Sequence, residues 1–257
     1  MRSLFRRSLV ACFAITTFGL LTTSWADASS REPTIKTPVP THWMPRTPMK
    51  CKRVAGVRHQ MCDGPRKTPE PYGPDAFVAE ELGLGTLEAG RKLLHEAPPA
   101  EWVRAVKGRA QPSLLWPVEE GTFGRGFGYV RKHRKSLRHN GVDVGAPVGS
   151  LVRSMNDGLV AYSDNQITGF GNTVVVLHKD KSVSVYCHQR ANYVFAGQQV
   201  RRGQVVGEVG VTGISRGPHL HFQWHVGGDA RDPMPRMTGQ PSRSKRGPLA
   251  SLSPLWM

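Results

Sequence analysis

Acidic residues are scarce in this chain. Its 257 residues include 19 Asp and Glu against 35 Lys and Arg, which gives a formal net charge of +16. Such an excess of positive charge favours polyanionic partners, so a nucleic acid has to be weighed among them. The sequence contains no recognisable nucleic-acid-binding module. We therefore expect polyanions of another kind, and no nucleic-acid partner.

Long apolar runs are also lacking. The run Leu9–Leu21 is too short to span a bilayer comfortably. It follows three arginines and precedes the small residues around Trp25, which is the pattern of a cleaved secretory signal over residues 1–26. A retained membrane anchor is the alternative. We expect an exported protein, in the periplasm, the cell envelope or the medium, with no stable membrane insertion after cleavage. The nearest polyanions would then be anionic wall polymers.

Cysteine is rare as well, with four in the chain, of which Cys12 lies in the predicted signal. Cys51 and Cys62 are close together in a Pro-, Gly- and basic-rich segment, and in an oxidising compartment this spacing predicts a disulfide loop. A zinc knuckle using His59 is the alternative, although a second ligand pair is missing. Cys187 lies in a strand-like run and is expected to be buried and inert.

Composition divides the rest of the chain. Residues 27–74 resemble an extended Pro- and basic-rich linker, and residues 238–257 a disordered basic tail. Residues 75–112 show a helical pattern in two pieces, broken at Gly83–Gly85 and ended by Pro98–Pro99. This region is too small for a core of its own, so it should pack on its neighbour or stay partly mobile.

Residues 113–237 show no amphipathic helical pattern. Short apolar runs recur at hairpin-like spacing and are separated by turn signals such as Asn156-Asp157-Gly158. This pattern predicts an all-β, mostly antiparallel domain. The runs are Leu151–Val152, Leu159–Tyr162, Thr173–Leu177, Val183–Tyr186, Val205–Val209 and Leu220–Val226.

Several short polar motifs fall inside this β domain. They are His139-x-x-x-Asp143, Tyr186-x-His188, Gly217-Pro218 and His219-x-His221, and each is weak by itself. Even spacing on a strand directs side chains to one face, so each motif should present its members together. Two imidazoles and one carboxylate suit an open catalytic zinc site. Further imidazoles beside the metal could orient a water molecule and stabilise an oxyanion.

The order of these motifs resembles that of the lysostaphin/LytM-type zinc endopeptidases, which are peptidoglycan hydrolases. The resemblance covers Trp116 to Met237, nearly half of the chain. It includes Trp116-Pro117-Val118, Phe123-Gly124-Arg125, His139-Asn140-Gly141-Val142-Asp143-Val144, Gly169-Phe170-Gly171-Asn172, Tyr186-Cys187-His188, Gly203-Gln204, Gly210-Val211-Thr212-Gly213 and Gly217-Pro218-His219-Leu220-His221-Phe222.

The resemblance implies an antiparallel β-sandwich with an open groove, and a zinc-dependent hydrolysis of peptide bonds in peptidoglycan by metal-activated water. One Zn²⁺ would be held by His139, Asp143 and His221. His188 and His219 would form the catalytic pair beside the metal, with the choice of base left open. Tyr186 would help to hold the substrate or the transition state.

Some residues depart from the family pattern. Gln189 replaces a commonly apolar residue, and Gln223 stands where Glu is frequent. The loop from Tyr129 to Arg138 is strongly basic and contains no acid, so it is either a cationic rim that holds the wall polymer or a solvated loop.

Two other functions fit the same resemblance. One is a non-catalytic LytM-type regulator of another wall hydrolase, and the other is a secreted peptidase that acts on Gly-rich protein. Some relatives are inhibited by an N-terminal segment, so residues 27–112 could be autoinhibitory, with residues 75–112 as a possible pro-segment. The peptide bond cut, the choice between the own wall and that of other cells, and the oligomeric state are not determined by the sequence.

Overall fold

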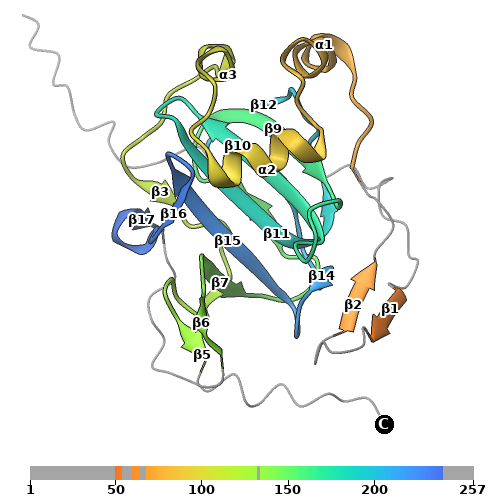
Figure 1. Cartoon of the computed structure of the whole chain (residues 1–257), viewed down its shortest axis with the longest axis vertical. Helices are drawn as coiled ribbons and strands as arrows, with labels where there is room; N and C mark the ends of the chain where they lie inside the picture. The colour runs from red at the N-terminus through yellow and green to blue at the C-terminus, as the bar shows by residue number, and fades with distance from the viewer. Residues whose placement is uncertain (1–49, 54–59, 64–67, 132–133, 240–257) are drawn as a thin grey trace, which may run out of the picture. The chain divides into compact units, whose positions relative to one another are not determined.

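The computed structural model describes residues 50–53, 60–63, 68–131 and 134–239 (Figure 1). At 50–53, 60–63, 131 and 134–137 the backbone alone is described. The predicted signal, most of the predicted linker with His59, and the tail from residue 240 lie outside the described residues. In the part of the chain that is described, no helix is long and apolar enough to cross a membrane.

A ten-stranded antiparallel sheet forms the centre of the molecule, which confirms the predicted all-β class. Seven strands follow the order β12-β9-β10-β11-β15-β7-β4; β13 pairs with β11 and β8, and β16 pairs with β15. All six apolar runs singled out in the sequence lie in strands. The strands are β4 (Thr122–Phe123), β7 (Val142–Gly145), β8 (Leu151–Arg153), β9 (Gly158–Asp164), β10 (Asn172–His178), β11 (Ser182–Asn192), β12 (Gln199–Val200), β13 (Val205–Val209), β15 (His219–Val226) and β16 (Asp229–Arg231).

Side chains alternate between the two faces of this sheet, and each face has its own core. On one face Val174, Tyr186 and Phe222 pack with Val152 of β8 and Val206 of β13, so the strands themselves enclose this core. We call it the strand core. On the other face the buried side chains of β9, β10 and β11 pack against the helical segment. This second cluster is called the helix core.

Three helices cover one part of the second face (Figure 1). They are α1 (Gly73–Leu82), α2 (Leu87–His95) and α3 (Ala100–Ala105). The break at Gly83 is correct, because this residue ends α1 with a left-handed φ of 64°. The two-piece prediction missed α3: the proline pair ends α2, but Pro99 is also the residue that caps α3. The helical region packs on its neighbour, as predicted.

Helix α2 buries more residues than α1 or α3. Thr86 accepts a hydrogen bond from the Ala89 backbone N–H at 3.1 Å and so caps the helix start. Leu93 and Leu94 are buried in the helix core together with Trp102 of α3. Cys187 of β11 lies in the same core, which confirms the expectation that it is buried. Burial raises the pKa of its thiol, which disfavours the reactive thiolate.

Short strand pairs complete the fold. They are β1 (Lys50–Arg53) with β2 (Gln60–Asp63), which also pairs with β14 (Gly213–Ile214); β3 (Leu114–Leu115) with β17 (Met237–Thr238); and β5 (Val130–Arg131) with β6 (Arg134–Arg138). A 3₁₀ helix, η2, spans Met234–Arg236. The β1–β2 register places Cys51 opposite Cys62, and the disulfide between them stays a prediction. The β5–β6 hairpin lies within the basic loop.

Candidate metal centre and active site

The polar residues of the sequence motifs meet where β7 pairs with β15. The register of this pair sets His221 directly opposite Asp143. Leu220 and Phe222 belong to the strand core. Because neighbouring residues of a strand point to opposite faces, His219 and His221 lie on the other face, the one that also carries the helices.

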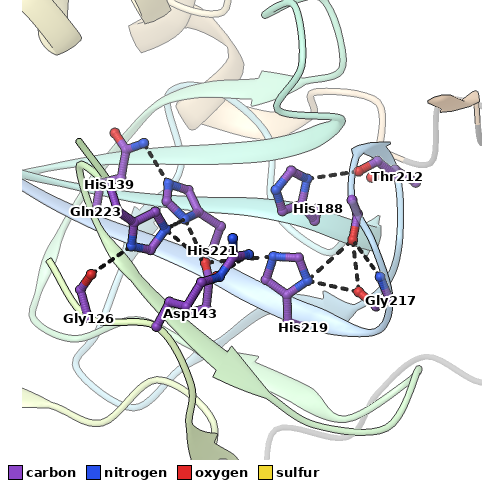
Figure 2. A network of polar contacts seen from close by, with 11 residues as sticks. Gly126, His139, Asp143, His188, Thr212, Gly217, His219, His221 and Gln223 are labelled. Carbon is purple, nitrogen blue, oxygen red and sulfur yellow. Dashed lines mark hydrogen bonds and ion pairs between the residues drawn. The ribbon is translucent and has the colours of Figure 1, made fainter. Parts of the chain in front are cut away.

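Three ligand-type atoms converge at this point (Figure 2). Nε2 of His139 lies 3.1 Å from Oδ1 of Asp143 and 3.1 Å from Nδ1 of His221, and Nδ1 of His221 lies 2.9 Å from the same carboxylate oxygen. Asp143 and His221 are buried, and His139 is half-buried. The structure thus brings these three predicted residues together within a triangle of nearly equal sides.

The triangle fits a zinc ion in size and chemistry. Zinc binds imidazole nitrogen and carboxylate oxygen at about 2.0–2.2 Å in tetrahedral geometry, which separates neighbouring ligand atoms by about 3.3 Å. The three observed separations, 2.9, 3.1 and 3.1 Å, are close to that value. A set of two imidazoles and one carboxylate also leaves the fourth position of such a site to water.

Outer contacts fix the orientation of two members of the triangle. The Nδ1–H of His139 donates to the Gly126 carbonyl at 2.9 Å, so the Nε2 lone pair is left for the centre. The two carboxylate oxygens of Asp143 have different partners. Oδ2 pairs with the Arg125 guanidinium at 2.6 Å, and Oδ1 faces the imidazoles. Burial alone would raise the pKa of Asp143, but the hydrogen bonds with His139 and His221 hold it well below its usual range.

His221 is oriented by an amide rather than by a carbonyl. Its outer Nε2 lies 2.8 Å from the Gln223 amide, whose oxygen in turn lies 2.8 Å from Nε2 of His225. All three side chains are buried and stand on one face of β15. The amide nitrogen of Gln223 thus faces Nε2 of His221, and its oxygen faces His225. A metal held by Nδ1 of His221 would leave the proton on Nε2, and the Gln223 amide would then be turned over so that its oxygen accepts that proton.

The glycine between His139 and Asp143 has a steric role. A Cβ on Gly141 would collide with the Phe222 carbonyl oxygen and would press on the His221 ring. The segment can therefore lie this close to β15 only with glycine at this position.

His188 and His219 stand beside the triangle, with their ring centroids 4.9 Å apart. The Nδ1–H of His188 donates to the Thr212 carbonyl, and that of His219 to the Gly217 carbonyl, both at 2.8 Å. Nε2 of His219 faces the triangle, 3.7 Å from Oδ1 of Asp143. Burial, with the neighbouring His221 and His219, lowers the pKa of His188 to about 3, so this ring is neutral.

Tyr186 does not share this face, and the prediction that it lies beside His188 is wrong. Its side chain is fully buried in the strand core, where its hydroxyl accepts a hydrogen bond from the Met155 backbone N–H at 2.8 Å. The expectation assumed regular strand alternation, but His188 has a left-handed φ of 62°. This residue reverses the alternation and turns the imidazole to the face opposite Tyr186. A role for Tyr186 in touching substrate has no geometric support.

Sequence reasoning gave no role to several side chains that complete the site. Arg125 stands in the sequence only as part of a motif, and His225 belongs to none of the motifs. The backbone carbonyls of Thr212 and Gly217 carry no side-chain signal at all. His178 lies outside the site: it is buried between the Asp157 carbonyl and the Ser184 hydroxyl, at 2.8 Å from each.

With the fold and the polar centre described, the chain can be compared with known proteins. Residues 137–233 match the model of Peptidase family M23. The lysostaphin/LytM-type resemblance of the sequence is thereby confirmed.

The relatives include both enzymes and an activator. The chain is 33% identical over 175 residues to the cell division protein DipM of Caulobacter vibrioides, covering 64% of this chain and 27% of DipM. It is 38% identical over 96 residues to the DD-carboxypeptidase/endopeptidase Mpg of Neisseria meningitidis, covering 37% of this chain and 22% of Mpg. It is 34% identical over 128 residues to the murein hydrolase activator EnvC of Escherichia coli, covering 50% and 30%.

The chain is also similar to parts of solved structures. A zinc-containing peptidase from Vibrio cholerae is 33% identical with a TM-score of 0.45, covering 49% of this chain and 40% of that one. Lysostaphin from Staphylococcus simulans is 30% identical with a TM-score of 0.44, covering 49% and 53%.

Proposed function

We propose that this protein is a zinc-dependent endopeptidase that hydrolyses peptide bonds in the stem peptides or cross-links of peptidoglycan. The observation that carries the proposal is the convergence of Nε2 of His139, Oδ1 of Asp143 and Nδ1 of His221, with two further imidazoles at its edge. These three residues would hold one Zn²⁺. When bound, the ion lowers the pKa of a coordinated water towards neutrality and polarises the scissile carbonyl.

The catalytic pair would handle the proton and the oxyanion. Both Nδ1–H groups are engaged with backbone carbonyls, so an unprotonated Nε2 of either ring offers its lone pair. A lone pair beside the centre can accept the proton of the attacking water, and the resulting N–H can then donate to the oxyanion or to the leaving amine. His219 is the better candidate for the base, because its Nε2 faces Asp143.

Arg125 would partly neutralise the Asp143 carboxylate. By pairing with Oδ2 of Asp143 it leaves a single carboxylate oxygen directed at the centre. Its guanidinium is about one-third exposed, so substrate can still approach it from solvent. The basic β5–β6 loop would add long-range attraction for anionic wall polymers. Peptidoglycan as substrate and export to the periplasm, the envelope or the medium belong to the same proposal.

Digestion of purified sacculi tests the proposal directly. The chain without residues 1–26, loaded with zinc, is expected to release peptide fragments whose masses define the bond cut. A chelator should stop the release, and zinc should restore it. A protein that binds no zinc and releases nothing would refute the enzyme proposal.

The same assay distinguishes the alternatives. EnvC is named as a murein hydrolase activator, so a regulator of this fold is the second candidate. A regulator would leave sacculi intact by itself and accelerate another wall hydrolase added to them. A peptidase for Gly-rich protein would cut Gly-rich peptides and spare the sacculi.

A further inference from the structure

A cavity of about 510 Å³ opens beyond the triangle. It lies between α2, the β9–β10 loop and the β15–β16 turn. The residues that matter here are Arg91, His95, Asn140, Thr168, Gln223 and Asp229. We call it the α2 pocket.

This pocket adjoins the metal centre. Its wall includes the Gln223 side chain, which contacts His221 at 2.8 Å, and Asn140, which directly follows His139. In Figure 2 Gln223 lies at the end of the centre away from His188 and His219. An extended peptide that crosses the centre from the catalytic pair would therefore reach the α2 pocket on the other side.

The charges of the pocket favour an anionic group. Arg91 is exposed, and among the described residues no carboxylate forms an ion pair with it. Asp229 is the acid among the lining residues, and it already pairs with Arg231 at 3.0 Å. His95 adds a second basic side chain. A planar guanidinium can donate two parallel hydrogen bonds to a carboxylate, so it selects this group over neutral amides.

The helix that supplies Arg91 is firmly placed. Leu93 and Leu94 of the same helix are buried in the helix core. At the helix end, Gly228 has a φ of 88° and lies so close to the His95 backbone that a Cβ would collide with it. The β15–β16 turn therefore packs directly on the end of α2. The pocket has a fixed wall built from residues that precede the M23 segment 137–233.

We infer that the α2 pocket is a substrate subsite that binds a carboxylate of the peptide, with Arg91 as the group that receives it. The inference rests on the proposed function, because it takes the bound molecule to be a peptide crossing the metal centre. It assigns a selectivity for acidic peptides to the helical segment of this chain.

Peptides that differ in one carboxyl group test the inference. Stem tetrapeptides would be prepared with each carboxyl converted in turn to the carboxamide, and their Kd for the zinc-loaded protein measured, together with kcat/KM on the matching cross-linked peptides. Amidation of the one carboxyl that Arg91 binds is expected to weaken peptide binding about tenfold, as for the loss of a charge-assisted hydrogen bond. In Arg91→Gln this difference should vanish, and Arg91→Lys should retain part of it.

Arg104→Gln is the matched control, since it removes an exposed arginine of α3 that does not line the pocket. It should discriminate between the peptides as the wild type does. If no single amidation matters, or if Arg91→Gln weakens every peptide equally, the subsite is refuted. If the wild type binds the peptides with the expected selectivity but cuts none of them, the subsite stands and the hydrolase proposal falls.

Discussion

The second face of the central sheet carries two contrasting regions. Under α1–α3 it is apolar, and Leu93, Val185 and Cys187 pack there with negligible exposure. Along β15 and β7 the same face is polar and presents His221 and Asp143. The helix-covered region gains free energy from burial, about 1.5–3 kcal/mol for each large apolar side chain. The polar region loses free energy by desolvating ionisable groups, which is visible in the lowered pKa values of His188 and His221.

Within this one face, the helix-covered region contributes stability and the polar region carries the proposed chemistry. The polar groups are retained in a costly environment, each oriented by a fixed partner such as the Gly126, Thr212 or Gly217 carbonyl. The helices stabilise the sheet and, at their edge, supply the α2 pocket. Substitutions in the two regions should therefore change different quantities.

The largest effect is expected from the carboxylate of the triangle. Asp143→Ala should abolish stoichiometric zinc binding and reduce peptide hydrolysis by several orders of magnitude, because both the metal and its activated water are lost. Zinc content by atomic emission and fragment release measure the two effects. Asp232→Ala, an exposed acid outside the site, is the control and should behave as wild type. Full zinc content in Asp143→Ala would remove this residue from the ligand set.

Substitution of either histidine of the catalytic pair should lower turnover without removing the metal. His188→Ala and His219→Ala are each expected to keep one zinc per chain while kcat falls about 10²–10⁴-fold, the range for loss of a general acid–base group. Steady-state kinetics on a cross-linked peptide and metal analysis of the same samples give both numbers. Loss of zinc in either variant would make that histidine a ligand instead.

Leu93→Ala addresses the helix-covered region. Because its side chain is fully buried in the helix core, the truncation should lower the free energy of unfolding by about 2–5 kcal/mol. Turnover per folded molecule should be unchanged. Urea denaturation measures the loss, and the half-buried Leu87→Ala should cost less.

Truncation of the chain near Gln111 would remove all three helices. It would expose the helix core and is expected to give an unstable protein. A stable, more active truncated chain would contradict this expectation and favour an inhibitory role for residues 27–112.

Substitution of Gln223, the outer partner of His221, should change the affinity for zinc. Gln223→Leu removes the side chain that contacts Nε2 of His221 and should weaken zinc binding about 10–100-fold, as loss of the outer partner of a metal-bound histidine generally does. Gln223→Glu keeps an acceptor and should stay close to wild type. Competition with a chromogenic chelator gives the affinities, with the exposed Gln166→Leu as control. Equal affinities for Leu and Gln at position 223 would contradict the role.

The smallest effect concerns pH. Burial lowers the pKa of His178, so below about pH 6.5 the unfolded chain binds a proton that the folded chain does not. Its contribution to stability is present above that pH and is lost as the pH falls. In metal-free protein, His178→Gln should flatten the decline in unfolding free energy by up to about 1.4 kcal/mol per pH unit. An unchanged slope would show that His178 does not titrate differently in the two states.

Much of this protein was determined by its sequence alone. The apolar runs predicted the strands, because alternation and turn residues are local signals. The His-x-x-x-Asp and His-x-His spacings contained the three residues of the triangle, and the family resemblance selected them from the two motifs. Tertiary structure decided the rest. The left-handed backbone at His188 separated it from Tyr186, and pairing across distant segments brought Arg125 to Asp143. The packing of α2 on β16 created the α2 pocket, which no local pattern could have indicated, since its walls come from segments more than a hundred residues apart.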